Sequence, residues 1–225
     1  MTWNAEGILS NGRELALLSL LNDNDIDVGI ITETEIPTSS HGDFNVEGYH
    51  TFLPVNHSDK LKTAKYRVMV VVRSELAALT KIRPDLMHPA VQSIWIQIDL
   101  GNRVLVGGLY REWSDLPQEY AASNRVKDQM EAAAAEVDNV IFAGDINLDA
   151  ARGTDKKYGR RCLLLAHDSA IAEANMRYLM TGVTYRSHGR HEREDGEARA
   201  HESILDHVYV TRDLEATVAV LTDST

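Results

Sequence analysis

The sequence predicts an α+β fold, a four-layer α/β sandwich in which two packed, mainly antiparallel β-sheets are flanked by helices. Runs rich in β-branched and aromatic residues recur along the 225-residue chain and are separated by turns. Most of these runs follow one another without a helix between them, which favours antiparallel sheets over a doubly wound parallel sheet. No internal repeat, heptad pattern or low-complexity linker is found, so a single domain over residues 1–225 is expected.

Most of the expected elements lie in the first two thirds of the chain. A helix is expected at about residues 13–22, where a broad stripe of leucines follows Asn11 and Gly12. The alanine-rich residues 116–137 have strong helix propensity, and the short apolar strand 139–144 follows them. The other expected strands in this part are residues 27–37, 48–55, 66–73, 93–100 and 103–111.

The last third of the chain is less regular. Residues 158–179 predict helices broken by a turn, and residues 182–187 begin another strand. Residues 188–202 mix both charges densely and contain two glycines, which is typical of a solvated hairpin loop. Two further alternating runs, residues 204–211 and 216–221, predict strands on either side of a turn.

Composition limits the classes of function. Hydrophobic residues make up 44% of the chain, and no apolar run approaches the ~20 residues that span a bilayer, so no membrane partner is expected. Cys162 is the only cysteine, and its apolar neighbours predict a buried thiol in a reducing compartment, nuclear or cytoplasmic. The net charge of −11 argues against high-affinity, sequence-independent DNA binding. It does not exclude an enzyme whose acidic cluster is covered by a divalent cation.

Polar side chains stand at the ends of several strong strands, where they can gather on one rim of a sheet. These are Asn4, Glu33, Tyr110, Asp145 and Asn147. Carboxylates and amides without clustered cysteine or histidine are the ligands that a hard cation such as Mg²⁺ prefers, and phosphate chemistry is its natural use. Each residue alone has a simpler interpretation: a cap, a solvated strand end, a rim aromatic or a local Asx turn.

The order of these residues carries more information than any one of them. Asparagine in a first strand, Glu-Thr-Glu one helix later, Tyr-Arg after a long β section, Gly-Asp-Ile-Asn after a helix, and finally Ser-x-x-Asp-His follow one another. This order resembles the endonuclease/exonuclease/phosphatase superfamily, and within it the apurinic/apyrimidinic-type endonuclease domains of non-LTR retrotransposons. The resemblance spans essentially the whole chain, and Gly-Asp-Ile-Asn is its most specific part.

The resemblance implies a Mg²⁺-dependent endonuclease, with Mn²⁺ as an alternative ion, that nicks target DNA for retrotransposition. It also implies attachment to a reverse transcriptase. Glu33 would be the principal metal ligand and Glu6 a second acidic ligand. Asp145 would orient or deprotonate the attacking water.

The same resemblance implies the residues that hold the phosphate. Asn4 and Asn147 would bind the scissile phosphate, and Tyr110 would donate its hydroxyl to a phosphate oxygen. Thr184 would contact the phosphate backbone, and Asp206 would orient the catalytic histidine.

The catalytic histidine itself is not evident. Alternation along a strand puts Asp206 and His207 on opposite faces, so His207 is expected to be a packing residue. In the family the histidine belongs to a Ser-Asp-His triplet after one further strand, so the chain is expected to be truncated just before this triplet and to lack its last strand. Two alternatives stay open: a degenerate element that no longer cuts, or substitution by a histidine of the charged loop. The histidines of this loop are His188, His191 and His201.

Two further departures from the family pattern concern the DNA-facing edge. Trp113 stands where nuclease relatives often have asparagine, and residues 65–73 lack the glycine-rich run of many retroelement domains. Residues 188–202 are the alternative place for a DNA contact. Two other functions stay open: a phosphoesterase of the same superfamily acting on a small-molecule or lipid phosphate, and a catalytically dead interaction module.

Overall fold

The computed structural model describes residues 1–10, 12–40, 44–55, 64–112, 116–150, 160–179, 182, 184–192 and 198–219. Its helices are α1 (Arg13–Asp23), α2 (Ser74–Ala77), α3 (Leu116–Glu136) and α4 (Arg160–Glu173), with short 3-10 turns η1 (Thr38–Ser40) and η2 (Pro84–Leu86). Its strands are β1 (Thr2–Asn4), β2 (Val28–Pro37), β3 (Tyr49–Phe52), β4 (Lys65–Arg73), β5 (Thr80–Ile82), β6 (Gln92–Asp99), β7 (Arg103–Tyr110), β8 (Asn139–Asp145), β9 (Met176–Leu179), β10 (Tyr185–Glu192), β11 (Ala198–Ser203) and β12 (Asp206–Thr211).

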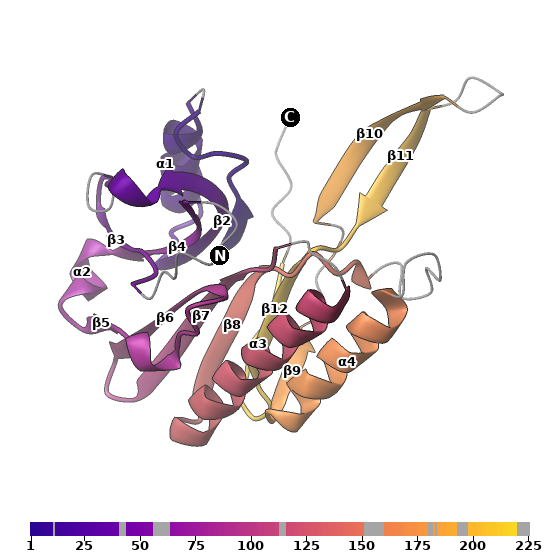
Figure 1. The fold of residues 1–225 in the computed structure, drawn as a ribbon. Coiled ribbons are helices and arrows are strands. Elements are labelled where there is room, and N and C mark those ends of the chain that lie inside the picture. Colours follow the sequence, from indigo (N-terminus) through magenta and orange to yellow (C-terminus); the bar gives the residue numbers. More distant parts are fainter. Residues whose placement is uncertain are drawn as a thin grey trace.

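The strands form two sheets and a separate hairpin (Figure 1). The first sheet has the order β1-β2-β4-β3 and the second β5-β6-β7-β8-β12-β9, while β10 pairs with β11. Within the described ranges, β1 with β2 and β7 with β8 are the parallel pairs, and the other pairs are antiparallel. The predicted mainly antiparallel sheets are therefore confirmed.

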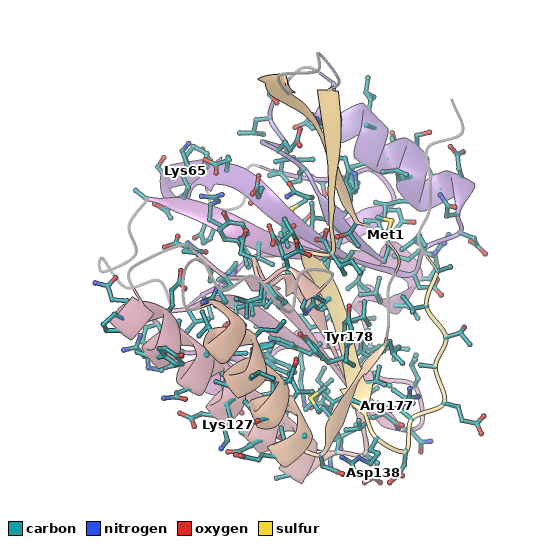
Figure 2. The ribbon with its side chains drawn as sticks, turned by 90° about the vertical axis from the view of Figure 1, so that its right-hand side faces the viewer. Met1, Lys65, Lys127, Asp138, Arg177 and Tyr178 are labelled. Atoms are coloured by element: carbon teal, nitrogen blue, oxygen red, sulfur yellow. The ribbon has the colours of Figure 1, made fainter. Side chains whose placement is uncertain are left out.

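Helices cover the outer faces of both sheets, which gives the predicted four layers. Helix α1 lies against the first sheet, and α3 and α4 lie side by side on the second (Figure 1). Lys127 of α3 pairs with Glu173 of α4, and in the side view Lys127 stands in the helical layer, while Met1 and Lys65 belong to the first sheet (Figure 2). None of the helices in the described ranges is both long and apolar enough to cross a bilayer.

Strand β4 is a continuous apolar run because both of its faces are covered. Val68 and Val70 pack toward the second sheet, whereas Met69 and Val71 pack in a separate core beneath α1. Successive side chains of a strand point to opposite faces, so a strand covered on both sides needs apolar residues at every position. The side chain of Val68 approaches Gly108 of β7 in the second sheet, which places β4 in the middle layer of the molecule.

The predicted helix through residue 179 is wrong at its end. Helix α4 ends at Glu173, Asn175 adopts a left-handed φ of 55°, and Met176–Leu179 forms the strand β9. This segment pairs with β12, so pairing with a distant strand overrides the local helical pattern.

Two other expectations near the carboxyl-terminal end need correction. Residues 188–202, expected as a loop, lie mostly in β10 and β11, which project from the body as a hairpin (Figure 1). Residues 216–219 of the expected strand 216–221 have no strand structure, and none of the described strands pairs with them. Residues 193–197 and 220–221 lie outside the described residues.

Candidate active site

A bulge in β2 begins the site. Thr32 pairs with Val68 and the next pair is Ile36 with Tyr66, so three residues of β2 stand opposite Arg67 alone. In a regular strand Tyr66 and Val68 would share a face, but Tyr66 packs beneath α1 and Val68 packs toward the second sheet. The bulge in β2 therefore reverses the direction of the side chains along β4 and turns Arg67 toward the second sheet.

The two glutamates of the bulge adopt an uncommon backbone conformation. Glu33 and Glu35 have left-handed φ angles of 50° and 56°. Such angles cost a non-glycine residue about 1–3 kcal/mol and are concentrated at functional sites. Thr34 between them is fully buried, and its hydroxyl donates to the carbonyl oxygen of Tyr66 at 2.6 Å. This hydrogen bond holds the bulge in place while both carboxylates reach Arg67.

Arg67 is a site residue that the sequence did not reveal. Its Nη2 donates to the Tyr110 hydroxyl at 2.7 Å, and its guanidinium carbon lies 4.1 Å from the centre of the Tyr110 ring. Its Nε lies 2.9 Å from Glu35, and its Nη2 lies 3.9 Å from Glu33. Lys65 also pairs with Glu35, at 2.7 Å. The sequence contains a basic residue in the strand that pairs with Glu-Thr-Glu, but only the strand register shows that Arg67 stands opposite these residues.

Asp145 and Asn147 stand at the end of β8, as their motif predicts. Asp145 is 2% exposed, and its Oδ1 accepts the backbone N–H of Asn147 at 2.9 Å in a local turn. Asn147 has a φ of 54° and donates from Nδ2 to the carbonyl oxygen of Arg111 at 2.8 Å. The side chain of Asn147 also hydrogen-bonds Tyr110. The Asx turn and the site are therefore the same structure.

The glycine of the motif explains why this turn can form. Gly144 has a φ of 142°, and a Cβ built on it would stand 2.0 Å from the carbonyl oxygen of Leu109. Only a residue without a side chain fits between β8 and β7 at this point. The close approach keeps Asp145 in register with Tyr110 on the neighbouring strand.

Asp206, the first residue of β12, lies directly opposite Asp145 of β8. The Thr184 hydroxyl accepts the backbone N–H groups of Leu205 and Asp206 at 3.0 and 3.2 Å, and it also hydrogen-bonds the Asp206 side chain. Thr184 thus fixes the start of β12. Its contact with a phosphate stays a prediction.

The two aspartates hold their protons more tightly than usual. Burial, the nearby Asp206 charge and, more weakly, Glu33 raise the pKa of Asp145 to about 8, against the opposing effects of the Asn147 N–H and Arg67. Burial and the Glu33 charge raise the pKa of Asp206 to about 6, although the Thr184 hydrogen bond opposes this. The rim therefore concentrates negative charge that the surrounding protein only partly compensates.

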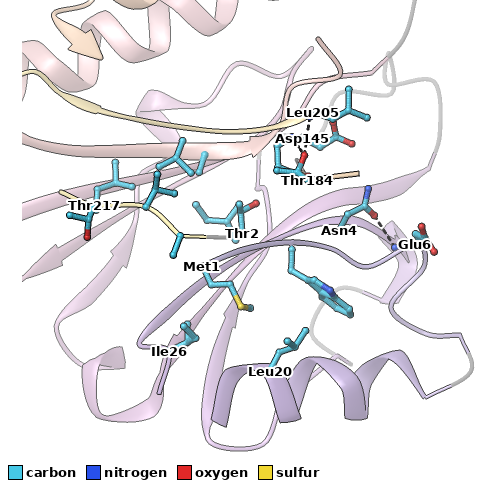
Figure 3. Close-up of a pocket in the computed structure, with 18 residues that line it drawn as sticks. Met1, Thr2, Asn4, Glu6, Leu20, Ile26, Asp145, Thr184, Leu205 and Thr217 are labelled. Carbon is cyan, nitrogen blue, oxygen red and sulfur yellow. Dashed lines mark hydrogen bonds between the residues drawn. The ribbon is translucent and has the colours of Figure 1, made fainter. Parts of the chain in front are cut away.

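A pocket of about 580 Å³ opens between the two sheets beside these aspartates (Figure 3). Asn4, Thr184 and the two aspartates line its polar end, and residues such as Met1 and Ile26 line its apolar end.

Glu6 also lines this pocket, but its carboxylate has another partner. Its backbone N–H donates to Asn4 Oδ1 at 3.0 Å (Figure 3). Its carboxylate pairs with Arg13 at 2.7 Å. Glu6 as a second metal ligand stays a prediction, and it requires this exposed ion pair to open.

The comparison with protein families identifies the fold. The model of the Endonuclease/Exonuclease/phosphatase family matches residues 1–224. The chain belongs to this family. Its members are hydrolases of phosphodiester or phosphate ester bonds. The resemblance stated from the motifs is therefore confirmed.

Solved structures of this family share the fold at low sequence identity. The endonuclease domain of TRAS1, a telomere-specific non-LTR retrotransposon, is 17% identical with a TM-score of 0.61, over 94% of this chain and 84% of that chain. The AP endonuclease LMAP from Leishmania major is 13% identical with a TM-score of 0.64, over 93% and 78%. A mannosyl-6-phosphatase from Bacteroides thetaiotaomicron is 13% identical with a TM-score of 0.60, over 94% and 84%. No curated protein matches the sequence.

Enzymes of this family generally use divalent metal ions, and the oxygen donors of the rim fit such an ion. Glu33 faces the buried aspartates, whose pKa values are raised by burial and by the neighbouring negative charges. The described residues contain no cluster of three or more acidic, histidine or cysteine side chains able to hold a metal. An ion that binds one or two carboxylates and keeps several waters does not need such a cluster.

His207 lies on the far side of β12, as strand alternation predicts. It is 1% exposed, its Nδ1 lies 2.5 Å from the Tyr209 hydroxyl, and its Nε2 lies 3.2 Å from the carbonyl oxygen of Ile204. His167 of α4 bonds the same hydroxyl at 2.9 Å. His207 is therefore part of a buried network that joins β12 to α4.

Several other expectations lie outside the described residues. Trp113 is not described, and the side chains of Cys162, His188, His191 and His201 are not described either. Their predicted roles stay predictions.

Proposed function

We propose that this chain is a Mg²⁺-dependent DNA endonuclease domain that hydrolyses a phosphodiester bond to nick target DNA. The observation that carries the proposal is the convergence of Glu33, Tyr110, Asp145, Asn147 and Asp206 at one rim. Two different sheets contribute these side chains, which come from positions spread over most of the chain. Simple packing does not require acidic and amide groups to meet in this way.

Asp145 is the group that handles the water proton. It is held by the Asn147 N–H, and a pKa of about 8 gives its carboxylate strong affinity for a proton. A Mg²⁺ ion on Glu33 would polarise the phosphate and supply positive charge for the developing negative charge. Burial, together with repulsion from Asp206 on the neighbouring strand, keeps the pKa of Asp145 high.

Tyr110, Asn147 and Asn4 position the phosphate. Burial raises the pKa of Tyr110 to about 12, so its hydroxyl keeps its proton and can donate it to a phosphate oxygen. Asn147 is fixed by its bond to the carbonyl oxygen of Arg111, and Asn4 lines the pocket.

The retroelement role rests on the motif pattern and on the fold shared with the TRAS1 endonuclease domain. It includes a DNA substrate, an attached reverse transcriptase and an intracellular location. His207 is bonded to Tyr209 on the far face, so another segment must supply the catalytic histidine.

The test is conversion of supercoiled plasmid to nicked circles by this domain in Mg²⁺. Asp145→Ala should slow nicking by roughly 10²–10⁴-fold. Asp27→Ala is the matched control, because Asp27 is exposed and pairs with Arg73 away from the rim. Equal rates for Asp145→Ala and the parent would refute the proposal.

A phosphoesterase of a small molecule or lipid is the second candidate. The apolar end of the pocket, the net charge of −11 and the fold shared with a mannosyl-6-phosphatase favour it. Turnover of a soluble phosphate ester without DNA nicking would select this function. If neither substrate turns over and Mg²⁺ does not raise the melting temperature, the domain is an interaction module.

A further inference from the structure

We propose that Arg67 binds a phosphate oxygen of the substrate beside Tyr110 and supplies a fixed positive charge at the rim. The inference rests on the proposed phosphate chemistry of this site and adds a residue to it. Arg67 stands at the bulge, and its side chain is 16% exposed. Its guanidinium touches the same phenol that is expected to hold the phosphate.

The donor count of Arg67 leaves room for a ligand. A guanidinium has five N–H donors in a fixed plane, and it matches the geometry of a phosphate with two of them. Here Nη2 donates to Tyr110 and Nε faces Glu35, while Nη1 donates no hydrogen bond to the described residues. The stacking on the Tyr110 ring fixes the plane without using a donor.

The hydrogen bonds of Tyr110 point in the same direction. Its oxygen accepts from Arg67, and the side chain of Asn147 forms a second bond that lowers the pKa of the phenol. The oxygen of Tyr110 accepts from Arg67, so this bond does not use the phenol's own proton. A phosphate oxygen that accepts a hydrogen bond from this hydroxyl would lie within reach of Arg67.

The charge of Arg67 is only partly neutralised. Glu35 divides its charge between Arg67 and Lys65, which lies 2.7 Å from the other carboxylate oxygen. Glu33 lies 3.9 Å from Nη2, at the outer limit of an ion pair. Arg67 therefore keeps positive charge for a ligand, in a protein whose net charge of −11 otherwise repels phosphate.

The experiment measures binding of inorganic phosphate by isothermal titration calorimetry, with and without Mg²⁺, and thermal unfolding of each variant. Arg67→Met should weaken phosphate binding roughly tenfold or more, and Arg67→Lys should weaken it less because the charge remains. Arg73→Met is the matched control, because Arg73 is on the same strand and stacks on Tyr49. The affinity of this variant for phosphate should equal that of the parent.

Phosphate affinity unchanged in Arg67→Met, equal loss in Arg73→Met, or no phosphate binding by the parent would each overturn the inference. If Arg67→Met does not fold, the phosphate affinity of Arg67→Lys is compared with that of the parent. Equal affinities of these two proteins would then overturn the inference. Phosphate binding does not depend on turnover. If the protein binds phosphate through Arg67 but does not nick plasmid, the proposed nuclease activity is contradicted. The inference about Arg67 then still stands.

Discussion

Strand β4 carries an arginine at each end, and the two ends serve different purposes. Arg67 stacks on Tyr110 and pairs with Glu33 and Glu35; Arg73 stacks on Tyr49, 5.8 Å from its ring centre. Arg73 likewise pairs with two acidic residues, Asp25 at 2.7 Å and Asp27 at 3.0 Å. The chemical groups at the two ends are therefore nearly the same.

The strand register separates the two arginines. At Arg73 the pairing is regular, since Tyr49 lies opposite Arg73 and Val28 lies opposite Val72. The donors of Arg73 close onto Asp25, Asp27 and the carbonyl oxygen of Ile26, which ties a surface loop to the sheet. At Arg67 the bulge turns the side chain inward, toward the buried aspartates of the second sheet. The comparison teaches that register, rather than residue type, makes one end of β4 a candidate site.

Gly144→Ala should break this comparison most severely, because it removes the register between β8 and β7. The added Cβ would stand 2.0 Å from a backbone oxygen, so the free energy of unfolding should fall by about 3 kcal/mol or more. Urea denaturation measures this fall. Gly29→Ala near Arg73 is the control, because its Cβ would meet the side chain of Val71 at 2.9 Å, and a side chain can shift. Equal losses in both variants would contradict the account of Gly144.

The pH dependence of stability sharpens the comparison at the Arg67 end. The pKa values of Asp145 and Asp206 are raised to about 8 and about 6 in the folded state, above the ordinary value of 3.8. Between about pH 4 and pH 8 the folded state keeps protons that the unfolded state has released, so the free energy of unfolding should fall as pH rises. Asp145→Asn should flatten this decline, and Mg²⁺ should reduce it. Urea denaturation across this range is the measurement, and a variant with the parent's slope would disprove the assignment.

Arg73→Met should have the smallest effect. The Asp25 and Asp27 side chains are 92% and 66% exposed, so water and salt screen both ion pairs. The melting temperature should change by no more than about 3 °C, and nicking should be unaffected. Differential scanning calorimetry and the plasmid assay check this. Loss of nicking would show that the two ends of β4 are coupled.

The sequence by itself determined the layers and most of the rim. Alternating and continuous apolar runs predicted β2, β4, β6, β7 and β8, because the period of side chains along a strand is fixed by backbone geometry. The Gly-Asp-Ile-Asn motif located the buried turn at Asp145 and Asn147, since glycine and asparagine mark positions that need unusual backbone angles. The same alternation placed His207 away from Asp206.

Only the tertiary structure decided what depends on distant partners. The inward direction of Arg67 follows from a bulge between strands about 30 residues apart, and β9 is a strand because β12 pairs with it. The raised pKa values of Asp145 and Asp206 come from burial and from their position across two strands. Local sequence sets backbone periodicity and propensity, whereas strand register, burial and charge proximity arise only when separate segments pack together.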